Sequence, residues 1–269
     1  MHNEVAFPLH AERGAAYLTA PNIAACHAFS TRLGGVSTGV LESLNLSVRR
    51  GDTPENVREN WRRLGAAAGI DLTRAVYAQQ VHSADVRIAH AADAQPPELE
   101  PRFTCDGFVT NEPGVPLAVF MADCLPVLLH DPIAGVIGAV HCGWRGSVAD
   151  ILGAAVAQMC ALGAHPADIR AAVGPAIGQC CFETDGDVPE ALRATLGAAA
   201  EPFMVWNGSK WHIDLKAVNA LWLQKAGVTR IDVCSHCTAC RPDLYWSHRK
   251  MGLRRGEQAA LIALREGTL

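Results

Sequence analysis

Three residues in the middle of the chain carry side chains that bind zinc, and each stands in a short motif of its own. The motifs are Gln80-Val81-His82-Ser83, Ala122-Asp123-Cys124-Leu125-Pro126 and His141-Cys142-Gly143-Trp144-Arg145-Gly146. Two imidazoles and one thiolate form a three-ligand set for Zn²⁺ that leaves a fourth position open, which is typical of catalytic rather than structural zinc. If the fold brings His82, Cys124 and His141 together, the chain is a metalloenzyme.

The segment after His141 has the pattern of an anion-binding loop. His141 ends the apolar run 135–140, so we expect it at the carboxyl end of a strand, followed by a glycine-containing loop and a helix that Ser147 caps. Such a loop points free backbone N–H groups at an anion, and a guanidinium adds donors suited to phosphate. The pattern predicts phosphate contacts from Gly143, Arg145, Gly146 and Ser147. A tight glycine turn beside a core histidine is the alternative.

Two further polar residues interrupt apolar surroundings. Asp123 precedes Cys124 at the end of an apolar run, where it either orients a ligand, carries a proton or caps a turn. Arg32 lies before Gly34 and Gly35, and two adjacent glycines indicate either a loop that approaches a ligand or a plain turn. We interpret Arg32 as an anion or ribose contact and Asp123 as part of the catalytic site.

A second cysteine motif offers a rival metal site. Cys234, Cys237 and Cys240 have Cys-x-x-Cys-x-x-Cys spacing, which binds zinc or an iron–sulfur cluster when a fourth ligand is supplied. No cysteine follows Cys240, so that ligand would come from a distant part of the chain; free thiols are the alternative. Cys180 and Cys181 are adjacent, and because adjacent side chains diverge in extended structure we do not expect both on one ion.

Composition favours an ordered globular protein. The 269 residues are 49% hydrophobic and 19% charged, which predicts a sizeable core in one large domain or two small ones. We interpret 1–269 as one domain, since the segment 91–102 is a loop and not a boundary, and we expect a loosely ordered start over 1–20. The net charge is −4 and there is no basic stripe, so neither nucleic acid nor an anionic membrane is an expected partner. The N-terminus lacks a secretory pattern, and ten cysteines indicate a reducing compartment, so we expect a cytoplasmic location.

Periodicity and capping residues predict a mixed α/β fold. Helices are expected after Thr53-Pro54, after Ser147, after Asp214 and near 187–199. The predicted strands are 76–81, 84–89, 116–123, 126–130, 135–141, 170–174, 229–233 and 258–264. A turn at 131–135 predicts antiparallel pairing of its two flanking strands, and the proline-rich segment 91–102 reads as an exposed loop. We therefore expect layered mixed sheets with helices packed outside.

The motifs in this order resemble the YfiH family, also called the laccase-domain or multicopper polyphenol oxidoreductase family. The resemblance runs from about Phe29 to Ile262. It rests on Thr31-Arg32-Leu33-Gly34-Gly35-Val36-Ser37, the three motifs around His82, Cys124 and His141, Asp106-Gly107, Gly174-Pro175-Ala176-Ile177-Gly178 with Cys180-Cys181, and Cys237-Thr238. The chain departs from the family pattern at Asn60-Trp61 and over 245–257, which bears on pocket shape but not on the metal ligands.

The resemblance implies a layered α/β domain in which His82, Cys124 and His141 hold zinc. It implies zinc-dependent phosphorolysis of purine nucleosides (adenosine, inosine, guanosine and methylthioadenosine), with adenosine deaminase as a second activity. Purine nucleosides and phosphate are then the partners of a monomer or homodimer, and copper is the alternative metal. Family members have also been linked to peptidoglycan-precursor editing and to copper-dependent phenol oxidation.

Three other hypotheses stay open. In a cysteine-based hydrolase, including a precursor-editing enzyme, Cys124 is the nucleophile and His141 its base. A copper-dependent polyphenol oxidase (laccase) is weaker, because one His₂Cys site does not supply the several coppers that four-electron reduction of oxygen needs. The third is a non-enzymatic, metal-stabilised binding module built on Cys234, Cys237 and Cys240, which would unfold on metal loss.

Overall fold

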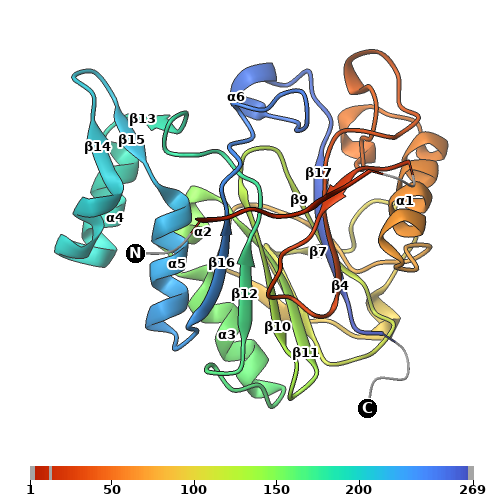
Figure 1. Ribbon diagram of the computed structural model, residues 1–269, viewed down its shortest axis with the longest axis horizontal. Helices are drawn as coiled ribbons and strands as arrows, with labels where there is room; N and C mark the ends of the chain where they lie inside the picture. Colours follow the sequence, from red (N-terminus) through yellow and green to blue (C-terminus); the bar gives the residue numbers. More distant parts are fainter. Residues whose placement is uncertain (1–3, 12–13, 266–269) are drawn as a thin grey trace.

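The fold is a four-layer arrangement of two β-sheets packed face to face between helices (Figure 1). The computed structural model describes residues 4–11 and 14–265. The larger, seven-stranded sheet has the order β1 (Glu4–Val5), β16 (Arg230–Cys234), β12 (Arg170–Val173), β10 (Leu125–Asp131), β11 (Val136–Cys142), β8 (Gly107–Thr110) and β6 (Val86–Ile88). The five-stranded sheet has the order β2 (Leu9–His10), β3 (Tyr17–Leu18), β4 (Cys26–Ser30), β17 (Gln258–Ala263) and β9 (Leu117–Met121).

Two small sheets complete the β-structure. One pairs β5 (Ala78–Gln79) with β7 (Phe103–Thr104), and the other has the order β13 (Glu183–Thr184), β15 (Trp211–Ile213) and β14 (Met204–Trp206). The short 3₁₀ helices are η1 (Gly39–Leu41), η2 (Val48–Arg50), η3 (Ala91–Asp93) and η4 (Gly197–Phe203).

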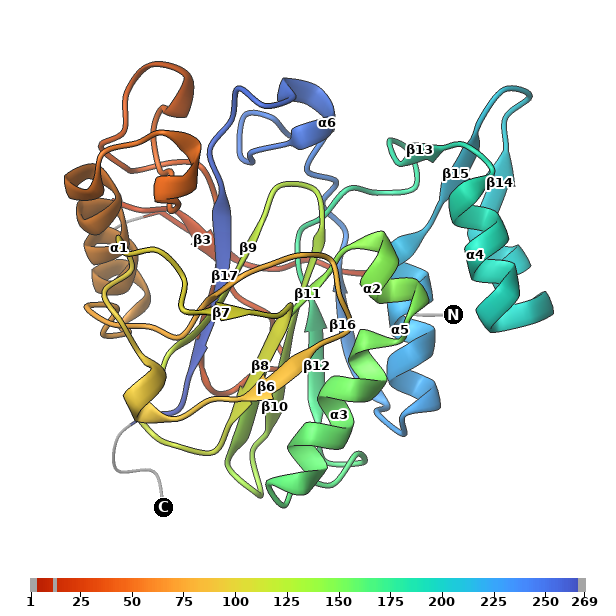
Figure 2. The same ribbon diagram turned by 180° about the vertical axis from the view of Figure 1, so that it is seen from behind.

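Helices cover the outer faces of both large sheets, as Figures 1 and 2 show from opposite sides. Helix α1 (Pro54–Ala68) lies on the five-stranded sheet, and α2 (Trp144–Val148), α3 (Ile151–Ala161) and α5 (Leu215–Lys225) lie on the seven-stranded one. Helix α4 (Asp187–Leu196) packs at the same outer layer, and α6 (His248–Met251) is a single turn near the C-terminal end. The predicted class, layered mixed sheets flanked by helices, is correct.

Alternation along the strands builds the layers. In β10, Val127 and Leu129 join the core under the helices while Leu128 joins the core between the sheets. In β17, Ile262 faces the inter-sheet core and Leu261 faces α1. Because successive side chains of a strand point to opposite faces, a run that is apolar throughout marks a strand covered on both sides.

Most predicted elements form, and one predicted cap is wrong. Thr53 caps α1 by accepting the N–H of Asn56, and β10 and β11 pair antiparallel as the turn at 131–135 predicted. Ser147 does not cap a helix, because it lies inside α2; Asp150 caps α3 by accepting the N–H of Gly153. Asp150 adopts a left-handed φ of 55° in the turn between α2 and α3, and this turn decides where α3 begins.

The N-terminal segment is tied to both large sheets, although we expected residues 1–20 to be loosely ordered. Strand β1 pairs in parallel with β16, and β3 pairs with β4. Phe7 and Leu18 are buried between the sheets, which explains the order of residues 4–11 and 14–20. Residues 1–3 and 12–13 lie outside the described part of the chain. Within the described part, no helix has both the length and the apolar character to cross a membrane.

Candidate active site between the two sheets

Three connections bring His82, Cys124 and His141 together. Cys124 lies in the turn through which the chain passes from β9 in the smaller sheet to β10 in the larger, His141 lies on β11, and His82 lies between β5 and β6. Their ligand atoms are all within 4.8 Å of one another. The two imidazole rings have centroids 5.0 Å apart and are tilted by 60°. The donor set and spacing fit one metal ion held by two nitrogens and a sulfur.

Asp106 orients both histidine ligands. Its Oδ1 accepts hydrogen bonds from Nδ1 of His141 at 2.8 Å and from the backbone N–H of His82 at 3.0 Å. Its Oδ2 accepts from the backbone N–H and hydroxyl of Ser83, both at 2.7 Å, and from the N–H of Val81 at 3.2 Å. Since Nδ1 of His141 donates to the carboxylate, Nε2 keeps its lone pair for a metal. In the sequence, Asp106 is marked only by a turn signal, because its partners lie 23 to 35 residues away.

The charges around His141 favour a cation. Burial acts to raise the pKa of Asp106, but the hydrogen bonds from His141 and Ser83 outweigh it and lower that pKa to about 2. Burial acts to lower the pKa of His141, but Cys124 and Asp106 outweigh it and raise that pKa to about 9. Burial and the neighbouring His141 lower the pKa of His82. One imidazole therefore holds a positive charge that a bound metal ion would replace.

Two residues of the site have left-handed backbone conformations, which are uncommon outside glycine. His82 has a φ of 62° and Asp123 a φ of 89°. The bonds from residues 81–83 to Asp106 hold the first. The second is held by the carboxylate of Asp123 itself, which accepts from the hydroxyls of Thr238 (2.6 Å) and Ser247 (3.0 Å) and from the N–H of Arg249 (2.6 Å).

The contacts of Asp123 do not favour the role of proton carrier that we considered. Its side chain is buried, both carboxylate oxygens accept hydrogen bonds, and it is not among the described residues that line the cavity. What the contacts support is the alternative of a positioning residue for the turn that carries Cys124.

The glycines after His141 serve close packing of the backbone. A Cβ on Gly143 would lie 2.8 Å from Nδ1 of His82, and a Cβ on Gly146 would lie 2.7 Å from the carbonyl oxygen of Ser83. The hydroxyl of Ser147 is fully buried and accepts a hydrogen bond from Asn219 at 2.8 Å. Gly143 and Gly146 thus fit the His82 loop against α2, and Ser147 joins α2 to α5. These contacts favour close packing over a phosphate cradle, because glycine allows close approach of any backbone as well as of a ligand.

The two predicted arginines differ in their surroundings. The guanidinium of Arg32 stacks over Trp246 at 3.9 Å and donates to the carbonyls of Pro242 (3.0 Å) and Glu42 (2.6 Å). These contacts favour a loop-bracing role over the anion or ribose contact that we predicted. Arg145 is exposed, stacks over Trp144 at 4.2 Å, and its charge contributes to the lowered pKa of His82, after burial and His141. Arg145 is therefore the member of the predicted phosphate set with a free charge near the metal ligands.

The three metal ligands line a cavity of about 270 Å³. Its apolar lining includes Val48, Tyr77, Pro97, Leu99, Pro101, Phe120 and Met121. Its polar lining includes Ser47, Arg49, Arg50, Gln80, Arg255 and Glu257. Pro97, Leu99 and Pro101 belong to the segment 91–102, which is thus part of the site as well as a loop. The volume is close to the lower end of the range of about 300–1,000 Å³ for small-molecule sites.

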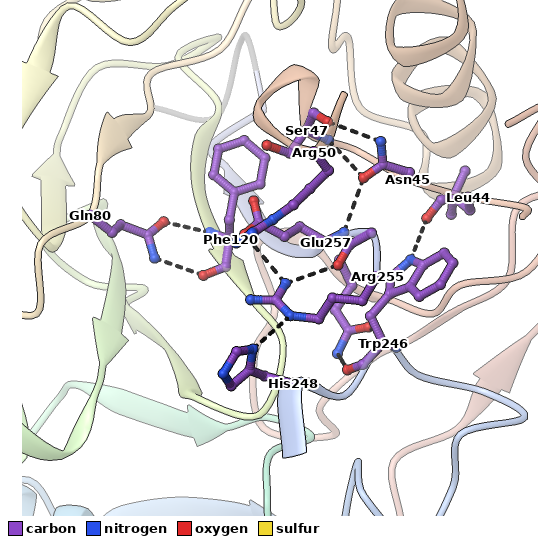
Figure 3. A network of polar contacts seen from close by, with 12 residues as sticks. Leu44, Asn45, Ser47, Arg50, Gln80, Phe120, Trp246, His248, Arg255 and Glu257 are labelled. Carbon is purple, nitrogen blue, oxygen red and sulfur yellow. Dashed lines mark hydrogen bonds and ion pairs between the residues drawn. The ribbon is translucent and has the colours of Figure 1, made fainter. Parts of the chain in front are cut away.

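An arginine network forms one wall of the cavity (Figure 3). Glu257 accepts from Nε of Arg50 at 2.8 Å and from Nη1 of Arg255 at 3.4 Å, and Nε of Arg255 lies 3.4 Å from Nδ1 of His248. Arg49 lines the same cavity, and in the described part of the chain no hydrogen bond or ion pair engages it. Three arginines and one carboxylate line the cavity here, so this wall carries excess positive charge suited to an anion. Sequence reasoning missed these arginines, since nothing local relates 49–50 to 255.

A clamp fixes the aromatic wall beside the metal ligands. The Gln80 side chain donates to the carbonyl of Phe120 and accepts its N–H, both at 2.7 Å (Figure 3). The rings of Phe120 and Tyr77 meet edge to face with centroids 5.9 Å apart. Such a rigid aromatic surface suits a planar ligand ring.

Residues 26–265 match the family model described as multi-copper polyphenol oxidoreductase laccase. The chain belongs to this family. It is 42% identical over 256 residues to a protein named purine nucleoside phosphorylase from Deinococcus radiodurans, covering 94% of this chain and 96% of the relative. The solved structure of YlmD from Geobacillus stearothermophilus has a TM-score of 0.89 and 36% identity, covering 97% of this chain and 99% of that one. YfiH of Bacillus licheniformis has a TM-score of 0.88 at 29% identity, covering 96% and 99%.

Proposed function

We propose that the protein is a zinc-dependent purine nucleoside phosphorylase, which converts a purine nucleoside and phosphate into the free base and ribose 1-phosphate. The observation that carries the proposal is that a His₂Cys ligand set and an arginine-rich wall line the same cavity. The names of the relatives support the same reaction. We further propose that residues 1–269 act as one catalytic domain, in a cytoplasmic monomer or homodimer that uses neither nucleic acid nor membrane.

The proposed metal is zinc, held by His82, Cys124 and His141. Zinc bound there would supply a Lewis acid with an open coordination position. The same donors also accept copper. Oxygen reduction by a laccase needs several coppers, and among the described residues the other group able to hold a metal consists of four thiols without histidine. The donor chemistry therefore favours zinc and a reaction without electron transfer.

The residues around the metal ligands would do the positioning. We assign the phosphate to Arg49, Arg50 and Arg255, which would neutralise its charge and aim an oxygen at C1′ of the ribose as the purine leaves. Tyr77 and Phe120 would hold the purine ring. Asp106 and Asp123 do not face the reacting atoms in this scheme; they hold the ligand-bearing turns in place.

Adenosine deamination is proposed as a second activity of the same site. In it water adds at C6 of adenine and ammonia leaves, giving inosine. The open coordination position and the water-accessible cavity support it, since neither the arginines nor phosphate is needed for that step.

A cysteine hydrolase is the second candidate. The observation that favours it is that Sγ of Cys124 and the free ring nitrogen of His141 lie within 4.8 Å of each other. Here Cys124 attacks and His141 accepts its proton.

Product chromatography tests the proposal. Purified protein is incubated with adenosine with and without phosphate, beside His82→Ala and the surface control His165→Ala. Adenine that forms only with phosphate, in the wild type and His165→Ala but not in His82→Ala, supports the phosphorylase. Inosine in the tube without phosphate supports the deaminase. If the zinc-loaded, folded wild-type protein forms neither adenine nor inosine, both activities are excluded for this chain.

A further inference from the structure

Four cysteines outside the cavity form a second cluster. The sulfur atoms of Cys180, Cys181, Cys237 and Cys240 all lie within 4.8 Å of one another. Cys180 and Cys181 follow β12, and Cys237 and Cys240 follow β16, the strand next to it in the larger sheet. An isolated bridge between Ala176 and Cys237 holds the two loops together. Of the three cysteines with Cys-x-x-Cys-x-x-Cys spacing, only Cys237 and Cys240 belong to the cluster.

Two expectations about these cysteines were wrong. Cys234 is buried on β16 and is not in the cluster, because its side chain belongs to the inter-sheet core. Cys180 and Cys181 do meet, because they lie in a turn and not in an extended segment. The N–H groups of Cys181 and Phe182 both donate to the carbonyl of Gly178 at 3.0 Å, which folds the chain so that the two adjacent thiols share one side.

The sulfur spacing matches a tetrahedral metal centre. The distances are 3.5 Å for Cys181–Cys240, 3.6 Å for Cys180–Cys240 and 3.8 Å for Cys180–Cys181. A tetrahedron with Zn–S bonds of about 2.3 Å has sulfur atoms about 3.8 Å apart. These distances are three of the six sulfur–sulfur edges, and the three edges to Cys237 lie within 4.8 Å.

A backbone donor also points at the cluster. The N–H of Gly178 donates to Sγ of Cys237 at 3.2 Å. Such a bond stabilises a thiolate, which is the form that binds metals. A Cβ on Gly178 would lie 3.2 Å from Cβ of Cys237, so the glycine is what allows this approach.

We propose that Cys180, Cys181, Cys237 and Cys240 bind a structural Zn²⁺ ion, separate from the ion of the cavity. Four protein ligands close the coordination sphere, which is the pattern of structural zinc, and each thiol releases its proton on binding. No oxidant or reductant takes part. The four-thiol chemistry also accepts iron, and two thiols could instead form a disulfide; both are outcomes that the experiment separates.

The proposed ion would brace the turn that carries Cys124. Thr238, next to Cys237, donates its hydroxyl to Asp123, and the N–H of Ile177 donates to the Asp123 carbonyl at 2.9 Å. Arg249 donates its N–H to Asp123 and its guanidinium to the carbonyl of Cys181 at 2.8 Å. Asp123 is thus held from both loops of the cluster. Loss of the proposed ion should therefore loosen the left-handed turn before Cys124.

Metal counting by plasma mass spectrometry tests the site. Protein purified under reducing conditions without chelator is compared with Cys180→Ser/Cys240→Ser, His82→Ala/His141→Ala and the exposed control Cys160→Ser. We expect two zinc ions per chain in the wild type and the control, and one in each double variant. One zinc in the wild type that Cys180→Ser/Cys240→Ser retains would overturn the proposal, as would iron in place of the second zinc. The count does not depend on which reaction the cavity performs.

A second measurement uses the unaltered protein, so it does not depend on the folding of a variant. The exposed Cys180 and Cys240 should resist a thiol reagent until a zinc chelator is added, whereas the exposed Cys160 should react at once. Immediate reaction of Cys180 and Cys240 before chelation would overturn the proposal. A mass lower by two hydrogens, mapped to a peptide pair of the cluster, would overturn it in favour of a disulfide.

Discussion

Asp106 and His141 are joined twice. The carbonyl oxygen of Asp106 accepts the backbone N–H of His141 at 2.7 Å, and its carboxylate accepts Nδ1 of the imidazole at 2.8 Å. The strand end and the ring plane are therefore fixed by one residue, which also holds the His82 loop through three successive N–H groups. Both imidazole ligands depend on a single buried carboxylate, and this dependence leads to the first prediction.

Asp106→Asn should lower the stability of the metal-free protein by about 2 kcal/mol at pH 7, because the carboxyl pKa of about 2 lies below its ordinary value of 3.8. A depressed acid pKa stabilises the folded state above the unfolded pKa, and the benefit disappears as pH falls through the folded pKa. The difference between wild type and variant should thus shrink from pH 4 to pH 2. Urea titrations at several pH values measure it, and a difference independent of pH would contradict this account.

Gly143→Ala should weaken zinc binding at the cavity site by about tenfold or more, the scale expected when a ligand's support is disturbed. The added Cβ would lie 2.8 Å from Nδ1 of His82, so the ring or the helix must shift. Gly186→Ala is the matched control, because its φ is −70° and its Cβ would meet only the end of the flexible Glu190 side chain. Zinc affinity is measured by competition with a chromophoric chelator. Equal affinity in both variants would show that the close approach is unimportant.

Arg255→Gln should raise KM for phosphate by about 10- to 100-fold, since a hydrogen bond to a charged group contributes about 1.5–3 kcal/mol. Arg145→Gln, which removes a charge outside the described cavity lining, should change it far less. Initial rates at varied phosphate and saturating inosine measure both. A larger effect from Arg145→Gln would return the phosphate to the loop after His141. Because Arg255 also bonds Glu257, the melting temperature of each variant is recorded alongside.

Removing the cavity metal with a chelator should abolish phosphorolysis while leaving the far-UV circular dichroism spectrum largely unchanged. The ligands of that site lie at the ends of strands and in connections, and the hydrophobic layers hold the fold together. A zinc finger needs its ion to fold, but this fold does not. Full activity after verified removal of zinc would favour the Cys124 nucleophile, which needs only its base His141. Added Zn²⁺ should restore the activity of the chelated wild type, and it should not restore that of His82→Ala.

Local patterns were sufficient where one short segment contains its own cause. The capped start of α1 at Thr53 and the antiparallel pair β10–β11 follow from neighbouring residues, and they form as predicted. For the loop after His141, the pattern predicted phosphate contacts from Gly143 and Gly146, with a tight turn as the alternative, and the structure places the His82 loop against both glycines. A glycine pattern reports that something comes near the backbone and carries no information on whether that is a ligand or another loop.

The residue types and local patterns of the sequence predict a His₂Cys set, layered mixed sheets with helices packed outside, and membership in a family through motifs at set positions. Which polar side chains come into contact depends on the tertiary structure. Asp106 reaches residues 23 to 35 positions away, Arg49 lines the same cavity as Arg255 and Glu257, and Cys181 lies beside Cys240 across 59 positions. These pairings depend on the stacking of two sheets. The two sheets stack through contacts between residues that are far apart in the sequence, and local propensities do not encode such contacts.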